Sequence, residues 1–450
     1  MQTEITIIIY FAAVLAIGIY SAFKIKTPDD YFVAGRKAGQ AQVSGSLLAT
    51  ILGGSAILGT IELSREIGWA ALWFLFSAAA GLLVLIPLSK RVKRFGNYTL
   101  PEMVGSFYGR RAEVISSAII PVAWLGIVAA QIIAAAKIIS GLGVAEYGVA
   151  AIIAGTVFIV YTLLGGQLSI LKTDALQAGL IIAGLAALVL FSINGAGTVN
   201  YERFTFGSLF NASFTGFDLL ILLLTYSVTF VVGPDIYSRL FCAKNEKTAA
   251  RSILIVAVVL IPVSVALTYL GVVSGETAGG GIVSFAGNLL PGWAYGLFIA
   301  ALLSAVMSSA DTTLLTSAMI VNELFTGDLN GKKSMRQTRR VVVVLGIASI
   351  VIALFVTSII QSLLFALAFF SGAFVVPVLA GLLNIKVNQK RVVYAIIAGG
   401  LIALTGKIIN VFVDEIAGNL IVVAAYLINA GMLFFGGNGE KQSRFKGGEF

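Results

Sequence analysis

The stretch SLLATILGGSAI, residues 46–57, decides the fold. It lies inside an apolar segment, 38–62, that is long enough to cross a bilayer core of about 30 Å. Gly53 and Gly54 stand together near its middle. Glycine weakens a helix, and irregular backbone inside a membrane is tolerated only beside a cavity or an ion. Close packing of a neighbouring helix against the two glycines is the alternative explanation.

A second interruption lies in VVGPDIY, Val231–Tyr237. Pro234 removes a backbone donor and disfavours helix at Gly233, although a simple kink would have the same sequence. The two interrupted segments are five apolar segments apart, so two groups of five helices would have opposite membrane orientations. Paired interruptions of this kind indicate a transporter binding site. We therefore predict hinges at Gly53, Gly54, Gly233 and Pro234.

The composition requires lipid as the solvent. Hydrophobic residues make up 58% of the 450 positions and charged residues 11%, against roughly 45–50% and 25% in soluble domains. This excludes an ordinary soluble enzyme, a disordered chain and a DNA-binding protein. Thirteen segments are long and apolar enough to span a bilayer: 4–23, 38–62, 67–89, 113–139, 147–164, 169–193, 216–240, 248–274, 292–324, 336–356, 360–382, 391–410 and 415–436.

These segments predict an all-α polytopic membrane protein with about 13 transmembrane helices. The expected architecture is a 5+5 inverted repeat with two broken helices. We divide the chain into a first extra helix with its inner loop (1–37), a first repeat (38–193), an outer loop (194–215), a second repeat (216–382), two C-terminal helices (383–436) and a disordered cytoplasmic tail (437–450).

The basic residues predict the orientation. The net charge is +9, and with the N-terminus outside, nearly every Lys and Arg falls in a cytoplasmic loop, as the positive-inside rule requires. Arg239 is counted among these loop residues. The exceptions are Arg65, Lys137, Arg203 and Lys407. We expect a multi-pass plasma-membrane protein with a cytoplasmic C-terminus and no nucleic-acid partner.

The sequence has no histidine and one cysteine, Cys242. A histidine-based metal site, a Ser-His-Asp triad and an intramolecular disulfide are therefore excluded. We expect a protein that is not an enzyme.

The densest polar cluster inside an apolar segment is AVMSSADTT, Ala305–Thr313. Ser308 and Thr312 are four residues apart and share a helix face. Hydroxyl and carboxylate oxygens at this density suit a small hard cation. Bonds from the hydroxyls back to their own helix are the alternative, but they do not explain Asp311.

Two further acids lie inside apolar segments, where ionisable residues are costly and indicate function. Asp174 lies near a cytoplasmic helix end, so a surface pair with Lys172 is the alternative. Asp235 follows the second interruption, and its alternative role is to cap the resumed helix. A carboxylate there would compete with an anionic solute for the helix N-terminus.

Four stretches together resemble the solute:sodium symporter family, which has the leucine-transporter-type inverted repeat. They are DYFVAGR (Asp30–Arg36), the Gly-Gly and Thr-Asp-x-x-Gln pattern of 161–177, PDIYSR (Pro234–Arg239) and the Ala305-x-x-Ser308-Ser309 pattern. The resemblance covers about residues 3–436.

The resemblance implies one Na⁺ site between the first interrupted helix and the segment 292–324. Its ligands would be the carbonyls of Ala49, Leu52 and Ala305 and the hydroxyls of Ser308 and Ser309. A second cation site, present in some members, would use Asp174, Ser308, Asp311 and Thr312. Asp311 replaces the hydroxyl usual in the family, so it either strengthens Na⁺ binding or holds a proton between two close acids.

The solute positions differ from the members whose substrates are known. Ala56 and Leu75 stand where sugar-transporting members have Gln and Glu, and Ile51 and Ser55 stand where proline-transporting members have Asp and Trp. The predicted pocket wall is small and largely apolar, and it contains Gly54, Ser55, Ala56, Trp124, Tyr226, Thr229, Phe230 and Phe369.

Such a pocket suits a monocarboxylate, an amino acid or a similar compact metabolite. The sequence is thus interpreted as a secondary transporter that couples a small organic solute to Na⁺ by alternating access. A proton-coupled symporter using Asp311 or Asp174 is the first alternative. A channel and a membrane sensor module are the others.

Overall fold

The computed structural model describes residues 2–95, 98–164, 166–195, 204–277, 281–327, 329 and 332–435. These residues form helices and connecting loops, and no strand occurs among them. The predicted tail, 437–450, and Arg203 lie outside the described residues. The first-half helices are α1 (Gln2–Ala22), α2 (Pro28–Val33), α3 (Gln40–Ile51), α4 (Gly54–Ile67), α5 (Leu72–Arg94), α6 (Leu100–Tyr108), α7 (Arg110–Gly141), α8 (Tyr147–Leu164) and α9 (Gln167–Gly195).

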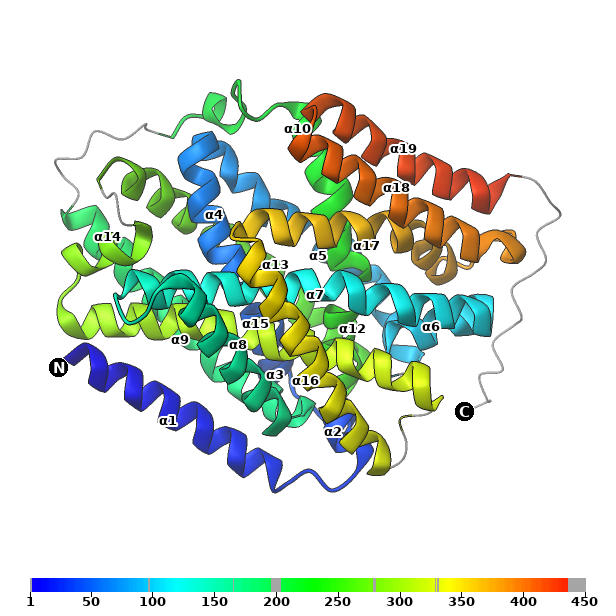
Figure 1. Ribbon diagram of the computed structural model, residues 1–450, viewed down its shortest axis with the longest axis horizontal. Coiled ribbons are helices and arrows are strands. Elements are labelled where there is room, and N and C mark those ends of the chain that lie inside the picture. The colour runs from blue at the N-terminus through cyan, green and yellow to red at the C-terminus, as the bar shows by residue number, and fades with distance from the viewer. Residues whose placement is uncertain are drawn as a thin grey trace.

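The second half repeats this alternation of short and long helices (Figure 1). Its helices are α10 (Gly216–Leu222), α11 (Val228–Val232), α12 (Pro234–Cys242), α13 (Glu246–Thr277), α14 (Gly281–Leu289), α15 (Gly292–Thr326), α16 (Lys332–Phe355), α17 (Ile359–Leu382), α18 (Val392–Phe412) and α19 (Glu415–Phe434). A π-helical turn, η4 (Leu223–Ser227), joins α10 to α11.

Ten helical stretches among the described residues are long and apolar enough to cross a membrane. Two shorter apolar helices are Ile5–Ser21 and Tyr147–Leu163. The stretch Gly54–Arg94 joins two of the predicted segments, and α3 is only half of a broken one. The count of thirteen is therefore not confirmed and stays a prediction.

Both sequence interruptions are breaks in the structure. Helix α3 ends at Ile51, and Gly53 is extended, with φ −62° and ψ 167°, before α4 begins. Helix α11 ends at Val232, and Gly233 is likewise extended, with φ −67° and ψ 132°. Pro234 then starts α12 at the first position, where its missing N–H costs nothing.

The first break needs glycine because α15 approaches it closely. A Cβ on Gly53 would lie 2.2 Å from Ser309 Oγ, and a Cβ on Gly54 would lie 2.3 Å from Val306 Cγ2. Real Cβ atoms do not approach other atoms this closely, so any side chain here would push α15 away.

The helix contacts follow the symmetry of an inverted repeat. Helix α15 packs against α9, and its counterpart α7 packs against α17. Helix α3 packs against α9 just as α11 packs against α17, and the two equivalent helices α5 and α13 pack against each other. The long helices α7 and α15 run side by side through the middle of the molecule (Figure 1).

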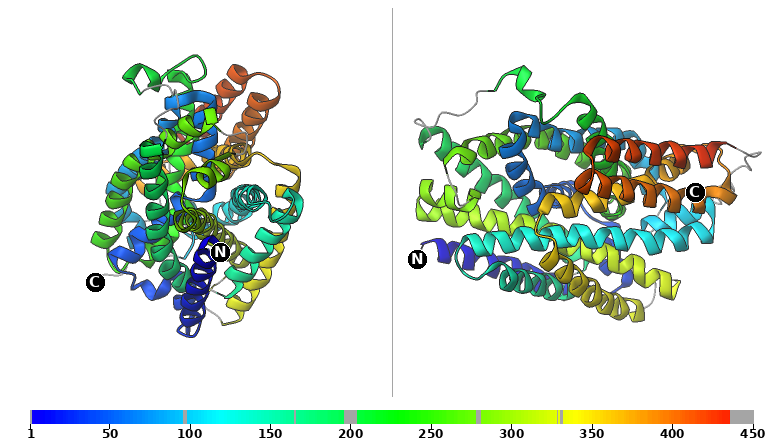
Figure 2. Two further views of the ribbon diagram at one scale, coloured as in Figure 1. Left: turned by 90° about the vertical axis from the view of Figure 1, so that its left-hand side faces the viewer. Right: turned by 45° about the horizontal axis from the view of Figure 1, so that its top comes forward.

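The remaining helices lie at the periphery. Figure 2 shows α18 and α19 as an adjacent pair at one edge, far from α1. Helix α1 packs against α15 and α9. The centre of the molecule is therefore formed by the two broken helices and by α7, α9, α15 and α17.

Candidate functional site

The first break presents carbonyl groups to the hydroxyls of α15. Ser308 Oγ donates to the Ala49 carbonyl at 2.8 Å and to the Ala305 carbonyl at 3.2 Å. Ser309 Oγ donates to the Thr50 carbonyl at 2.7 Å. Leu52 is the C-cap of α3, immediately before the extended Gly53. The structure thus gathers the residues predicted to bind Na⁺ at one buried contact between α3 and α15.

The donor set at this contact fits a monovalent cation. Ser308 and Ser309 are 0% and 2% exposed, and the polar groups that meet here are carbonyls and hydroxyls. No group of three or more His, Cys, Asp or Glu that could hold a metal occurs among the described residues. Uncharged oxygen ligands bind a hard cation without the charge that a tightly held divalent ion needs.

Arg239 occupies the region predicted as a second cation site. The prediction that Arg239 lies in a cytoplasmic loop is wrong, because its side chain is 0% exposed. Its Nη2 donates to Thr50 Oγ1 at 2.7 Å, to Thr312 Oγ1 and to Asp174 Oδ2 at 3.3 Å. Its Nε donates to Ser46 Oγ at 3.1 Å. Because the helix is broken at Gly233–Pro234, α12 starts inside the molecule, and the Arg239 guanidinium on it lies in the core.

The predicted alternative for Asp174, a surface pair with Lys172, is also wrong. Asp174 is 0% exposed and forms an ion pair with Arg239, and its Oδ2 also accepts a bond from Ser46. Lys172 instead lies over the ring of Tyr20, 5.5 Å from its centroid. The cluster of Ser46, Thr50, Asp174, Thr312 and Arg239 ties α3, α9, α12 and α15 together.

Asp311 adds a second carboxylate beside this cluster. It is 1% exposed, and Thr312 Oγ1 donates to its Oδ1 at 3.4 Å. The other oxygen, Asp311 Oδ2, is buried without a hydrogen-bond partner, as is Asp174 Oδ1. This region thus holds two carboxyl groups and one guanidinium.

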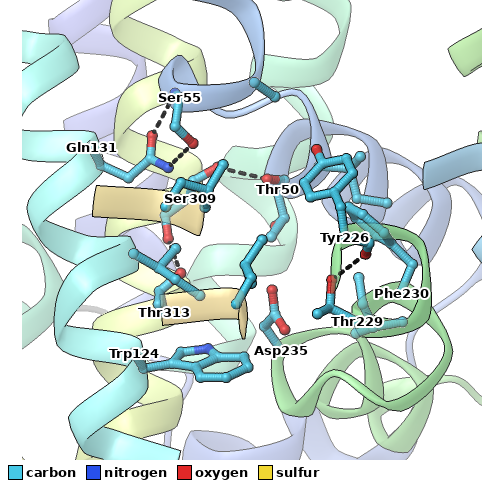
Figure 3. A pocket seen from close by; sticks show the side chains of 16 residues that line it. Thr50, Ser55, Trp124, Gln131, Tyr226, Thr229, Phe230, Asp235, Ser309 and Thr313 are labelled. Carbon is cyan, nitrogen blue, oxygen red and sulfur yellow. Dashed lines mark hydrogen bonds between the residues drawn. The ribbon is translucent and has the colours of Figure 1, made fainter. Parts of the chain in front are cut away.

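A cavity of about 60 Å³ lies between the two breaks (Figure 3). Six residues of the predicted pocket wall line it: Ser55, Ala56, Trp124, Tyr226, Thr229 and Phe230. Gly54 and Phe369 are not among its lining residues. Gly54 faces Val306, and the Phe369 ring packs against Gly400 on α18.

Gln131 is a lining residue that the predicted pocket wall omitted. Its Nε2 donates to Ser55 Oγ at 2.7 Å, and its Oε1 accepts from the Ser55 backbone N–H at 3.3 Å. Gln131 thereby holds the first turn of α4 against α7. The signal in the sequence was a lone amide within the apolar run of α7.

Asp235 is another lining residue that the predicted pocket wall omitted. It lies in the first turn of α12, and in Figure 3 its carboxylate points into the cavity, between Trp124 and Phe230. Thr50, Ser309 and Thr313 line the same cavity, so the pocket and the contact between α3 and α15 share residues.

A second cavity, of about 270 Å³, lies among α4, α10, α18 and α19. We call it the vestibule. Phe74 lines the vestibule and stacks on Tyr226, which lines the smaller cavity, with ring centroids 4.1 Å apart. Tyr226 also meets Phe230 edge to face at 5.0 Å. These three rings form a layer between the two cavities.

Comparison with known proteins agrees with this architecture. The sequence model of the sodium:solute symporter family matches residues 31–399. The chain belongs to that family. It is therefore a Na⁺-coupled symporter, embedded in a membrane, and not an enzyme.

Two of the most similar relatives are bacterial symporters. The sodium/pantothenate symporter of Escherichia coli is 25% identical, over 91% of this chain and 92% of the relative. The sodium/proline symporter of the same organism is 26% identical, over 90% and 87%.

Solved structures confirm the fold class. A Na⁺-coupled sialic acid symporter, in a substrate-bound outward-open state, superposes with a TM-score of 0.76 at 17% identity, over 96% of this chain and 98% of that one. A nucleobase-cation-symport-1 family transporter superposes with a TM-score of 0.60 at 14% identity, over 90% and 95%. At these identities the likeness concerns the fold alone.

Proposed function

We propose that this symporter carries a small organic solute across the plasma membrane together with Na⁺, by alternating access. The observation that carries the proposal is the contact between the first break and α15, where Ser308 Oγ lies 2.8 Å from the Ala49 carbonyl. Na⁺ bound there would bridge α3 and α15 through the carbonyls of Ala49, Leu52 and Ala305 and the hydroxyls of Ser308 and Ser309. The two hydroxyls would turn their lone pairs to the ion.

The solute would bind in the adjacent cavity at the two breaks. The cavity is far smaller than drug-sized pockets, and it shares Ser309 and Thr50 with the surroundings of the proposed ion site. Two relatives are named for pantothenate and proline, which supports a compact solute such as a monocarboxylate or an amino acid.

Coupling requires that each ligand binds one conformation better than another. We propose that 38–193 and 216–382 are the two repeats whose relative movement exposes the site to either side. Gly53, Gly54, Gly233 and Pro234 would act as the hinges. The N-terminus would lie outside and the C-terminus in the cytoplasm, where the basic loops concentrate.

Proton coupling is the second candidate function. The buried oxygens Asp174 Oδ1 and Asp311 Oδ2 have no hydrogen-bond partner, which is the environment of a site that takes up a proton. In this alternative Asp311 or Asp174 would carry the proton, and Na⁺ would not drive uptake.

Proteoliposomes with separately imposed gradients distinguish the two. We expect an inward Na⁺ gradient at equal pH to drive accumulation of proline, pantothenate or another small-solute hit from a metabolite screen. An inward proton gradient without Na⁺ should leave uptake at the level of empty vesicles. Accumulation that follows the proton gradient and ignores Na⁺ would contradict the proposal.

A further inference from the structure

The solute cavity has an unusual charge balance. Sixteen residues line it, and Asp235 is the one charged side chain among them; no lysine or arginine takes part. The remaining lining is apolar, hydroxylic or amide in character. A carboxylate at the wall of a small cavity is stabilised by a positive charge near it.

Arg239, one turn further along α12, lies next to Asp235 but outside the cavity, and its Nη1 donates to the Asp235 backbone carbonyl at 3.3 Å. It is absent from the lining, and its guanidinium is held by Asp174 at 3.3 Å and by the Thr50 and Ser46 hydroxyls. The guanidinium forms its ion pair with Asp174, and no ion pair between Arg239 and the Asp235 carboxylate occurs among the described residues. The Asp235 carboxylate remains available to a cation that enters the cavity.

The N-terminus of α12, beside the cavity, already has a carboxylate next to it. Asp235 lies in the first turn of α12, where a negative charge complements the helix dipole. Its Oδ1 lies close to the start of the helix, since a Cβ on Gly233 would be 3.0 Å from it. A solute carboxylate would have to share this end with a like charge.

The aromatic walls favour a cation in the same place. Trp124, Tyr226 and Phe230 line the cavity around Asp235 (Figure 3). The faces of such rings attract ammonium groups. Trp124 Nε1 is buried and has no hydrogen-bond partner, so it offers a donor to an oxygen of the solute.

Acidic side chains also outnumber basic ones among the residues that line the vestibule. Glu66, Asp218 and Glu415 line it, against one base, Lys407. Lys407 donates to Asn410 Oδ1 at 2.8 Å. The excess of carboxylates would raise the local concentration of cations next to the aromatic layer of Phe74, Tyr226 and Phe230.

We propose that the solute of this symporter carries a positively charged nitrogen, held by Asp235 against the aromatic walls, and an oxygen acceptor for Trp124 Nε1. The solute class is thus an amino acid or a related oxygen-bearing amine, and a simple monocarboxylate is excluded. This inference rests on the proposed function, because it assigns the smaller cavity to the solute.

The test uses three compounds built on a five-membered ring, each added to the purified protein. L-proline carries both charges, pyrrolidine only the ammonium and cyclopentanecarboxylate only the carboxylate. A wider panel pairs other small amino acids with the nitrogen-free acids of equal size. Thermal stabilisation of the protein is the readout, with and without Na⁺.

We expect Na⁺-dependent stabilisation by at least one ammonium-bearing compound and by none of the nitrogen-free acids. Asp235→Asn should weaken the affinity of that compound at least about tenfold, as expected for losing one partner of a buried charge pair. Asp235→Glu should restore part of it. The exposed Glu146 provides a matched control, since Glu146→Gln removes a carboxylate outside both cavities and should change nothing.

Three results would overturn the inference. The first is stabilisation by a nitrogen-free acid that persists in Asp235→Asn, and the second is the lack of any ammonium-bearing hit. In the third, Asp235→Asn would lower Na⁺ affinity and leave solute selectivity unchanged, which would make the carboxylate an ion ligand. Loss of Na⁺-driven uptake in the wild type would instead contradict the proposed function itself, so the two failures are distinguishable.

Discussion

Arg239 shows what a single residue contributes to the polar centre of this protein. Its side chain is fully buried and satisfies groups on three other helices, with Asp174 as its charged partner. Breaking a buried ion pair leaves an uncompensated charge, which costs about 3–5 kcal/mol. An exposed pair such as Arg94–Glu246, with side chains 71% and 33% exposed, is worth at most about 1 kcal/mol.

We therefore expect Arg239→Met to lower the thermal unfolding midpoint strongly and Arg94→Met to leave it nearly unchanged. Arg239→Lys should rescue only part of the loss, because an ammonium lacks the planar fork that reaches several acceptors at once. Unfolding of the detergent-solubilised protein, followed by fluorescence, measures all three variants. Equal midpoints for Arg239→Met and Arg94→Met would show that the buried pair is not needed.

Some residues of the polar centre could be predicted from the sequence and others could not. Ser308 and Ser309 could be singled out because hydroxyls are conspicuous inside an apolar helix. Arg239 could not, because it lies five residues after a break and five before Lys244. Counting charges does not tell whether such a residue belongs to the buried helix or to the cytoplasmic loop. Gln131 and Asp235 required knowledge of which helix faces meet.

The broken helices are the elements on which the account depends. The Gly-Gly and Gly-Pro interruptions were visible in the sequence because glycine and proline act locally. The approach of α15 to Gly53 was not visible, since it depends on the packing of residues some 250 positions apart. The π-helical turn at Leu223–Ser227, which places Tyr226 in the cavity wall, left no sequence signal either.

Helix packing at the first break gives a second prediction. Gly53→Ala would place a Cβ 2.2 Å from Ser309 Oγ, so α15 must move and the proposed Na⁺ ligands must separate. We expect Na⁺ affinity to fall at least about tenfold, equivalent to ~1.4 kcal/mol.

Gly179→Ala in α9 is the matched control, because nothing lies within 4 Å of a Cβ there. Alanine should stabilise that helix by about 0.5–1 kcal/mol without changing Na⁺ affinity. Titration of Na⁺ against thermal stability measures both variants. Wild-type Na⁺ affinity in Gly53→Ala would refute the role assigned to the break.

At the scale of the whole molecule, the pairing of α7 with α17 and of α15 with α9 reproduces the symmetry expected from the spacing of the two breaks. The fold class could be predicted because the number of apolar segments between the two interruptions can be counted in the sequence. The number of membrane-spanning helices could not be predicted, because some apolar helices are short and one helical stretch, Gly54–Arg94, joins two predicted segments. The orientation rests on the distribution of basic residues alone.

Cysteine labelling tests the orientation. Cys242, the one cysteine, is buried, so the wild type should give little background. Glu146→Cys lies in the predicted outer loop between α7 and α8, and Lys390→Cys in the predicted inner loop before α18. A membrane-impermeant maleimide should label Glu146→Cys in intact cells and Lys390→Cys only after permeabilisation. The reverse pattern would invert the topology.

The most direct test of the central claim is sodium binding at the contact between the first break and α15. Radiolabelled Na⁺ is titrated against the purified wild type, Ser308→Ala with Ser309→Ala, and Ser317→Ala. Ser317 is a control on the same helix, because its hydroxyl bonds back to the Thr313 carbonyl at 2.8 Å. We predict that the Na⁺ affinity of the double variant falls at least about tenfold, while Ser317→Ala matches the wild type. Wild-type affinity in the double variant would contradict the account.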